Sequence, residues 1–233
     1  MVGHETLDLG VLVRIQAGQL AYVYRWWLCL ALAWPGACLA EEPAVLPAVA
    51  SQGPIDTALL EQPWPGQWVH EYEVGRDPVL WRHKLSREQG ILTGARFVAP
   101  ASLDTAWALS TGYTDLGAMT PGVSAVRVLE ESETRQVIEV DIKVLWKRLT
   151  LRFEIERAPP RAVRFRLTNE VVGEYRGLCR LTPHEAGTAV ELATWLRPAV
   201  PVPERVIVGV MRYVMLRGIR EFLRTCRGQP QSG

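Results

Sequence analysis

The stretch PERVIVGVMRYVMLRGIREFLR, residues 203–224 of a chain of 233 residues, decides the fold. Its opening proline and glutamate suit the first turn of a helix. Apolar residues then recur at helical spacing within one arc of the helix, whereas the arginines at 205, 212, 217, 220 and 224 fall outside that arc. The arc contains Ile207, Val208, Met211, Val214, Met215, Gly218, Ile219 and Phe222. One face of this helix therefore needs a partner, and the other face suits water.

The segments before the helix supply that partner. Apolar and polar residues alternate with a period of two in 137–146, 149–156, 163–168, 174–181 and 190–196, and a further strand is indicated at 91–99. Antiparallel sheets commonly bury one such face and leave the other in water. The sequence therefore predicts an α+β protein in which a curved antiparallel β-sheet wraps around a long C-terminal α-helix.

A shorter helical region follows the strand at 91–99. Pro100 stops that strand, Ser102 can cap a helix with Asp104 in its first turn, and Gly112 ends the helix. A second short helical or turn segment is indicated at 113–119. The predicted order is therefore strand, helix, short helix, a meander of strands and the long helix.

Several local segments resemble one known family. They are FVAP at 97–100 leading into DTAW at 104–107, YTDL at 113–116, PGV at 121–123, RVLE at 127–130 and the strand after the double proline at 159–160. With the order of elements, they resemble the helix-grip (START-like) fold of the SRPBCC superfamily, the polyketide cyclase/dehydrase and lipid-transport proteins, which includes the coenzyme Q-binding proteins. The resemblance covers about residues 90–226. GLCRL at 177–181 stands where relatives often have Gly-x-Trp-x-Leu, and Gly112-Tyr113 stands where many have Asp-Tyr, so a differently shaped cavity is expected.

The resemblance implies that an apolar small molecule, such as a lipid, a quinone or a polyketide-like compound, binds in a cavity between helix and sheet. Methionine and glycine on the helix leave adjustable space for such a ligand. The alternative is that the same residues fill an ordinary core. The expected cavity residues are Trp107, Tyr113, Val140, Ile142, Phe153, Phe165, Tyr175, Cys179, Leu192, Thr194, Met211, Met215, Gly218 and Phe222.

Catalytic and metal-binding patterns are not found in the sequence. There is no GxSxG, HExxH or phosphate-binding glycine loop, and His70, His83 and His184 have no neighbouring ligand at metal spacing. We expect no catalytic residue, no metal and no cofactor. Two alternative functions stay open. One is a cyclase/dehydrase-type enzyme that uses Tyr113 or Tyr175, and the other is a protein-interaction domain with a filled core that docks through the tryptophans between 64 and 81.

The charges of the chain are balanced, with 26 lysines and arginines against 25 aspartates and glutamates. Nucleic-acid binders usually have a strong basic excess, so a nucleic-acid partner is not expected. The arginines on the outer helix face could contact anionic lipid headgroups transiently, or they could form a solvated surface.

The N-terminus carries a targeting pattern. Arg25 precedes the apolar run 26–34, and Cys38-Leu39-Ala40 precedes two glutamates, which fits a bacterial signal peptide of residues 1–40 cleaved after Ala40. The run 26–40 is shorter than the roughly 20 residues that span a bilayer. We therefore expect an exported, periplasmic protein, with an uncleaved leader that tethers it to the inner membrane as the alternative.

The remaining chain divides by composition. Residues 41–66 are rich in alanine and proline and predict a linker, residues 67–89 predict an N-terminal extension with two short strands, and residues 90–227 form the predicted START-like domain. Without the leader, Cys179 and Cys226 are the cysteines that remain. They could form a disulfide, or they could be two separate buried thiols.

Overall fold

The computed structural model describes residues 53–62, 69–86, 90–112, 122–144, 147–169, 171–199 and 201–228. From Pro54 onward these residues belong to one compact unit. The predicted leader, Trp64, Trp68 and the segment 113–119 with Tyr113 lie outside the described residues.

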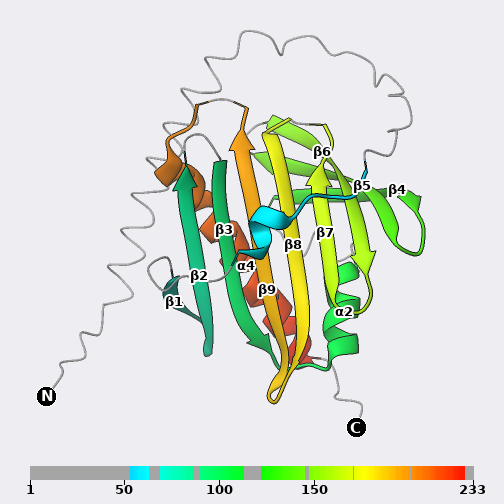
Figure 1. The fold of residues 1–233 in the computed structure, drawn as a ribbon, viewed down its shortest axis with the longest axis vertical. Coiled ribbons are helices and arrows are strands. Elements are labelled where there is room, and N and C mark those ends of the chain that lie inside the picture. The colour runs from blue at the N-terminus through cyan, green and yellow to red at the C-terminus, as the bar shows by residue number, and fades with distance from the viewer. Residues whose placement is uncertain are drawn as a thin grey trace, which may run out of the picture. The chain divides into compact units, whose positions relative to one another are not determined.

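In the described part of the chain, nine strands form one antiparallel sheet (Figure 1). Their order across the sheet is β1-β2-β3-β9-β8-β7-β6-β5-β4, so β3 and β9 join two runs of hairpin-connected strands. The strands are β1 (Val69–Val74), β2 (Asp77–Ser86), β3 (Gly90–Ala99), β4 (Val123–Glu131), β5 (Arg135–Val144), β6 (Lys147–Ala158), β7 (Ala162–Leu167), β8 (Gly173–His184) and β9 (Gly187–Pro198).

Two α-helices, α2 (Leu103–Thr111) and α4 (Glu204–Gly228), lie on one face of this sheet, which we call the inner face (Figure 1). Ser102 caps α2 as predicted, because its hydroxyl accepts a hydrogen bond of 3.2 Å from the backbone N–H of Thr105. Helix α4 begins directly after Pro203, also as predicted. The predicted fold class, a long C-terminal helix held by a curved antiparallel sheet, is thus confirmed.

The register shows which side chains share the inner face. Thr93 pairs with Thr194 and Phe97 with Val190, whereas Phe165 pairs with Gly177 and Ile138 with Phe153. The apolar positions of the predicted alternation therefore lie on one face, because cross-strand partners point to the same side of a sheet. Phe222 of α4 packs against the core of this face, and its ring meets that of Phe97 edge-on with 6.0 Å between centroids.

The predicted extension continues the same sheet. Strands β1 and β2 are antiparallel, and β2 pairs with β3 from Leu80 to Ser86. Trp81 of β2 is 1% exposed and packs in the core of the inner face. The described part of residues 67–89 therefore belongs to the same sheet as the strands of residues 90–199 and is not a separate extension.

A short segment packs on the opposite, outer face of the sheet. It contains the 3-10 helix η1 (Ala58–Glu61), which lies in front of the strands in Figure 1. Leu60 is 1% exposed and packs with Leu92, Leu178 and Trp195. Arg82, which is fully buried, donates hydrogen bonds to the backbone carbonyl oxygens of Leu60 (3.1 Å) and Gln62 (2.7 Å). The linker predicted for residues 41–66 is therefore corrected for its described part, residues 53–62, because buried apolar and polar contacts hold that part to the sheet.

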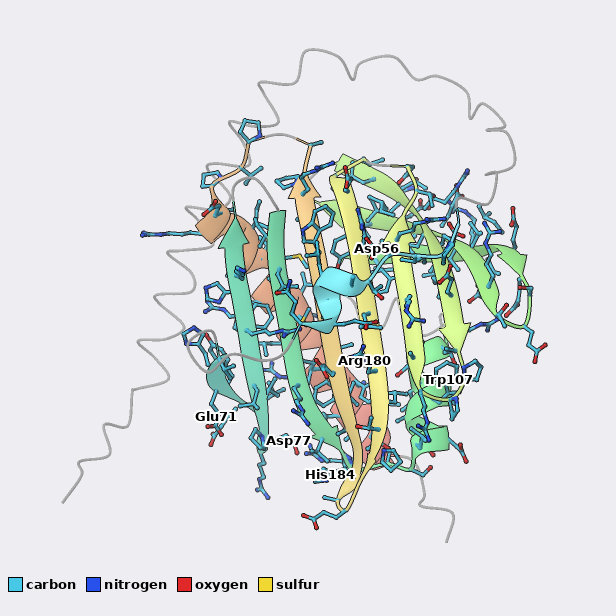
Figure 2. All side chains as sticks on the ribbon, in the orientation of Figure 1. Asp56, Glu71, Asp77, Trp107, Arg180 and His184 are labelled. Atoms are coloured by element: carbon cyan, nitrogen blue, oxygen red, sulfur yellow. The ribbon has the colours of Figure 1, made fainter. Side chains whose placement is uncertain are left out.

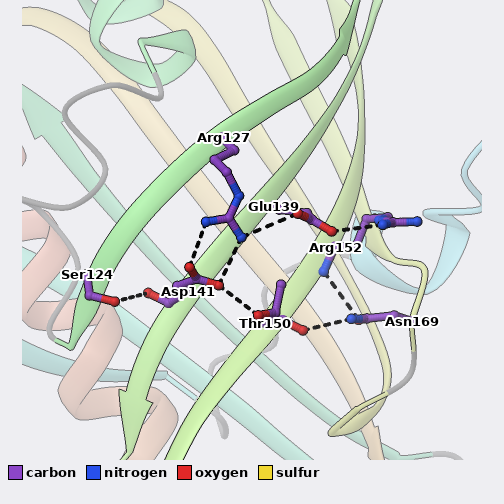
Figure 3. Close-up of polar contacts among 7 residues, drawn as sticks. All are labelled: Ser124, Arg127, Glu139, Asp141, Thr150, Arg152 and Asn169. Carbon is purple, nitrogen blue, oxygen red and sulfur yellow. Dashed lines mark hydrogen bonds and ion pairs between the residues drawn. The ribbon is translucent and has the colours of Figure 1, made fainter. Parts of the chain in front are cut away.

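The outer face of β4, β5 and β6 carries a network of charged side chains (Figure 3). Arg127 bonds Asp141 at 2.8 Å and Glu139 at 3.4 Å, and Arg152 bonds Glu139 at 2.8 Å. Thr150 donates a further hydrogen bond to Asp141 at 2.7 Å. The hydrogen bond from Arg127 is the main cause that lowers the pKa of Asp141. These carboxylates lie on the outer face, as predicted, and link strands across it.

Candidate functional site

The two halves of α4 differ in how closely they pack. Ile219, Leu223 and Cys226, toward its C-terminal end, are 1–3% exposed. All of α4 is described, and no side chain between residues 208 and 218 is buried. Met211 and Met215 are half-buried there, although they belong to the apolar arc that faces the sheet. The C-terminal half of α4 is therefore in a closely packed core, and the middle of the helix is not.

The inner face of the sheet shows the same incomplete burial from β5 to β9. Water reaches apolar side chains that nevertheless pack at the margin of the core, namely Ile142, Phe153, Phe165 and Leu192. In a closely packed interior such side chains would be buried. The apolar surfaces of the sheet and of the middle of α4 therefore define the candidate site.

Three aromatic rings form the centre of the sheet side of this site. The ring centroids of Phe153 and Phe165 are 6.0 Å apart, and that of Tyr175 lies 6.3 Å from Phe153 and 5.7 Å from Phe165. Gly177 allows this arrangement, because a Cβ atom at this position would come within 1.9 Å of Cζ of Phe165. The Phe165 ring therefore covers the space that a side chain at 177 would need.

Hydroxyl and thiol groups lie among these apolar side chains. Tyr175 forms a hydrogen bond with Thr194, and burial raises the pKa of Tyr175 to about 12. Burial also raises the pKa of the Cys179 thiol to about 12, and this thiol forms a hydrogen bond with Ser110 of α2. Both groups are therefore neutral at pH 7, because the apolar surroundings disfavour their anions. Cys179 and Cys226 are two separate buried thiols, so the alternative of a disulfide is excluded.

A second polar group on the inner face was missed by the sequence analysis. The rings of His70 and His83 stack with 5.5 Å between centroids. Arg212 of α4, assigned from sequence to the wet face, is half-buried and donates a hydrogen bond of 3.0 Å to the hydroxyl of Tyr72. Burial, His70 and Arg212 lower the pKa of His83. The signal was present in the alternation, because His70 shares its side of β1 with Tyr72, and His83 shares its side of β2 with Trp81.

The structure gathers most of the predicted cavity residues on the two sides of this site. Val140 is 3% exposed and belongs to the core, and Phe222 packs at the closely packed end of α4. Trp107 is half-buried on α2 (Figure 2). The other predicted residues lie on the inner face of β5 to β9 or on α4, and of these Cys179 and Thr194 are buried whereas the rest are half-buried. They are Ile142, Phe153, Phe165, Tyr175, Cys179, Leu192, Thr194, Met211, Met215 and Gly218. Tyr113 lies outside the described residues.

Other features of the described residues lie away from this site. His184 lies at the β8–β9 turn (Figure 2). No group of three or more histidine, cysteine, aspartate or glutamate side chains in the described ranges could hold a metal ion. Among the helices formed by the described residues, none is long and apolar enough to cross a membrane.

Known structures share this architecture. The STAR-related lipid transfer protein (fragment 25–204) from Xanthomonas axonopodis matches at 14% identity and a TM-score of 0.53, covering 68% of this chain and 98% of its own. Human StAR-related lipid transfer protein 5 matches at 11% identity and a TM-score of 0.50, covering 70% and 88%. The di-domain ARO/CYC StfQ from the steffimycin biosynthetic pathway matches at 13% identity and a TM-score of 0.52, covering 61% and 53%. At these identities the similarity shows the fold alone.

The family of this chain is assigned from its sequence. No curated protein matches the chain. The family model described as polyketide cyclase / dehydrase and lipid transport matches residues 91–228, which is more than half of the chain. The matched range begins in β3 and ends with α4, so it contains both surfaces of the candidate site. The chain therefore belongs to the polyketide cyclase/dehydrase and lipid-transport family of the START-like SRPBCC superfamily.

Proposed function

We propose that this protein binds an apolar small molecule of the lipid or quinone class between the middle of α4 and the inner face of β5 to β9. The observation that carries the proposal is a pair of apolar surfaces that pack against the same core and that water still reaches, with Met211 and Met215 on α4 and Phe153, Phe165 and Leu192 on the sheet. The family assignment supports it, as do the two similar structures that are named lipid transfer proteins.

The energetics favour an occupant of this kind. Each Å² of apolar surface removed from water contributes about 25 cal/mol, so a ligand that covers these side chains gains from both surfaces. Methionine side chains are unbranched and polarizable, and they adapt to irregular apolar shapes. The site therefore suits a range of apolar ligands, and shape alone does not select one of them.

Met215→Trp tests the proposal, because the indole would occupy the space next to the half-buried methionine. Nile red, a neutral dye whose emission shifts to the blue in apolar surroundings, serves as the probe in a fluorescence titration. We expect the wild-type protein to bind it saturably and Met215→Trp to weaken binding by more than about tenfold, or about 1.4 kcal/mol.

The matched control is Tyr213→Trp, which adds the same side chain to α4 at a position that is 48% exposed. We expect this variant to bind Nile red as the wild-type protein does, and thermal unfolding of all three proteins to show that each is folded. Wild-type affinity in a folded Met215→Trp variant would refute the proposed site, and so would an absence of dye binding to the wild-type protein.

A further inference from the structure

Three hydroxyl groups form a chain across the inner face of the sheet. Thr93 of β3 pairs with Thr194 of β9, and their Oγ1 atoms share a hydrogen bond of 2.7 Å. Thr194 pairs in turn with Gly177 of β8, two residues from Tyr175, and forms a hydrogen bond with the Tyr175 hydroxyl. The chain therefore runs from Thr93 through Thr194 to Tyr175, over three neighbouring strands.

The three hydroxyl groups have more protons than there are hydrogen bonds between them. Each hydroxyl group has one proton to donate. Within the described part of the chain, the three hydroxyl groups form two hydrogen bonds, which use two of the three protons. Either threonine can be the donor in the bond between Thr93 and Thr194. We take the direction from Thr93 to Thr194 to Tyr175, in which the phenolic proton of Tyr175 is the one that remains.

Of the three hydroxyl groups, that of Tyr175 is also the one that a ligand can reach. Thr93 and Thr194 are only 1% and 6% exposed, whereas Tyr175 is half-buried among the rings of the candidate site. A tyrosine hydroxyl in a mostly apolar environment usually has a hydrogen-bond partner. A ligand that fills the site would exclude water from this hydroxyl, so a ligand that carries an acceptor gains a hydrogen bond there.

The surroundings of Tyr175 favour an uncharged acceptor. Its described ring neighbours are Phe153 and Phe165, and burial raises the pKa of both Tyr175 and Cys179 to about 12. An environment that disfavours a phenolate and a thiolate also disfavours the carboxylate of a ligand. The guanidinium group of Arg212 bonds Tyr72 of β1, and β2, β3 and β9 separate β1 from β8. An anionic ligand would be expected there and not at Tyr175.

We propose that the Tyr175 hydroxyl donates a hydrogen bond to an uncharged carbonyl oxygen of the ligand, and that the Thr93–Thr194 pair orients this hydroxyl. The proposal rests on the proposed function and gives it a ligand class, namely neutral apolar ketones, esters or quinones. Pure hydrocarbons would bind without this bond, and ionised carboxylates would be disfavoured. Tyr175 is then a specificity-determining residue of the site.

Tyr175→Phe removes the donor and keeps the ring. Equilibrium dialysis would measure the affinity of the wild-type and variant proteins for menadione, a neutral quinone, for 2-methylnaphthalene, its hydrocarbon counterpart, and for 2-naphthoate, a carboxylate. We expect the variant to bind menadione roughly five- to tenfold more weakly, the value of one hydrogen bond, and to bind 2-methylnaphthalene within about twofold of the wild-type protein. We expect 2-naphthoate to bind more weakly than menadione.

An infrared spectrum of bound menadione provides a readout that a purely structural role would not change. The carbonyl band should lie at lower frequency in the wild-type protein than in Tyr175→Phe, because a hydrogen bond weakens the C=O bond. Tyr213→Phe, which removes an exposed hydroxyl from α4, is the control and should change neither affinity nor spectrum.

The outcomes separate this inference from the proposed function. Equal weakening of menadione and 2-methylnaphthalene in Tyr175→Phe, or tighter binding of 2-naphthoate than of menadione, would overturn the hydrogen-bond proposal while the apolar site stands. Failure of the wild-type protein to bind any of the three probes would overturn both.

Discussion

Leu223→Ala is expected to lower the free energy of unfolding by about 2–5 kcal/mol, the usual cost of removing a large buried aliphatic side chain. Leu223 is 1% exposed at the closely packed end of α4. Met215→Ala, two turns earlier on the same helix, is expected to cost roughly 1 kcal/mol or less, because the methionine side chain already meets solvent in the folded protein. Urea unfolding monitored by circular dichroism measures both values.

The comparison is matched in helix propensity. Leucine and methionine have similar intrinsic propensities, and both substitutions introduce alanine. The difference between the two variants therefore reports packing. Equal losses of stability would mean that α4 packs uniformly along its length, and the candidate site would then be part of an ordinary core.

Gly177→Ala is expected both to destabilise the protein and to impair ligand binding. The new Cβ atom would lie 1.9 Å from Cζ of Phe165, so the ring must move off the sheet, toward α4. Overpacking of this kind costs about 1–3 kcal/mol. The displaced ring would occupy the candidate site, so the affinity for Nile red should fall by about tenfold, or 1.4 kcal/mol. Thermal unfolding and the dye titration measure the two effects.

Gly209→Ala is the control for this substitution. A Cβ atom at Gly209, in α4, would have no atom within 4 Å apart from its chain neighbours and the nearby backbone of the helix itself. Alanine should therefore stabilise the helix by up to about 1 kcal/mol through its higher helix propensity. If Gly177→Ala kept wild-type stability and wild-type dye affinity, the proposed packing of the Phe165 ring over Gly177, beside the candidate site, would be wrong.

The sequence predicted the fold because two periodicities identify the apolar faces of its elements. The alternation around Val140, Phe153, Phe165 and Leu192 places each of these side chains on the inner face, where the strand register confirms them. The apolar arc of residues 203–224 likewise identified the side of α4 that faces the sheet. Periodicity of this kind fixes the direction of a side chain, which suffices for the fold class.

Periodicity could not predict which inward-facing side chains are closely packed. Val140 and Ile142 are similar residues on the same side of β5, yet Val140 is buried and Ile142 is half-buried. Likewise, Ile219 is buried and Met215 is not. The difference depends on how closely other elements pack against each position, and this packing depends on contacts between elements that are far apart in sequence.

The polar group at β1 and β2 was missed for a related reason. His70 and His83 were assigned to an extension outside the domain, so their alternation was not connected with that of β3. Arg212 was assigned to solvent from the helical wheel, but a long side chain can reach back to Tyr72 across the edge of the sheet. Leu60 could not be predicted as buried because the segment around it has no sustained period.

Native mass spectrometry of the protein purified without detergent tests the central claim most directly. We predict that the wild-type protein carries a stoichiometric apolar adduct, that solvent extraction releases it for identification, and that the adduct is missing from folded Met215→Trp. A wild-type protein with a clean apo mass, which takes up nothing from a panel of lipids and quinones, would contradict the claim that α4 and the inner face of the sheet enclose an apolar ligand.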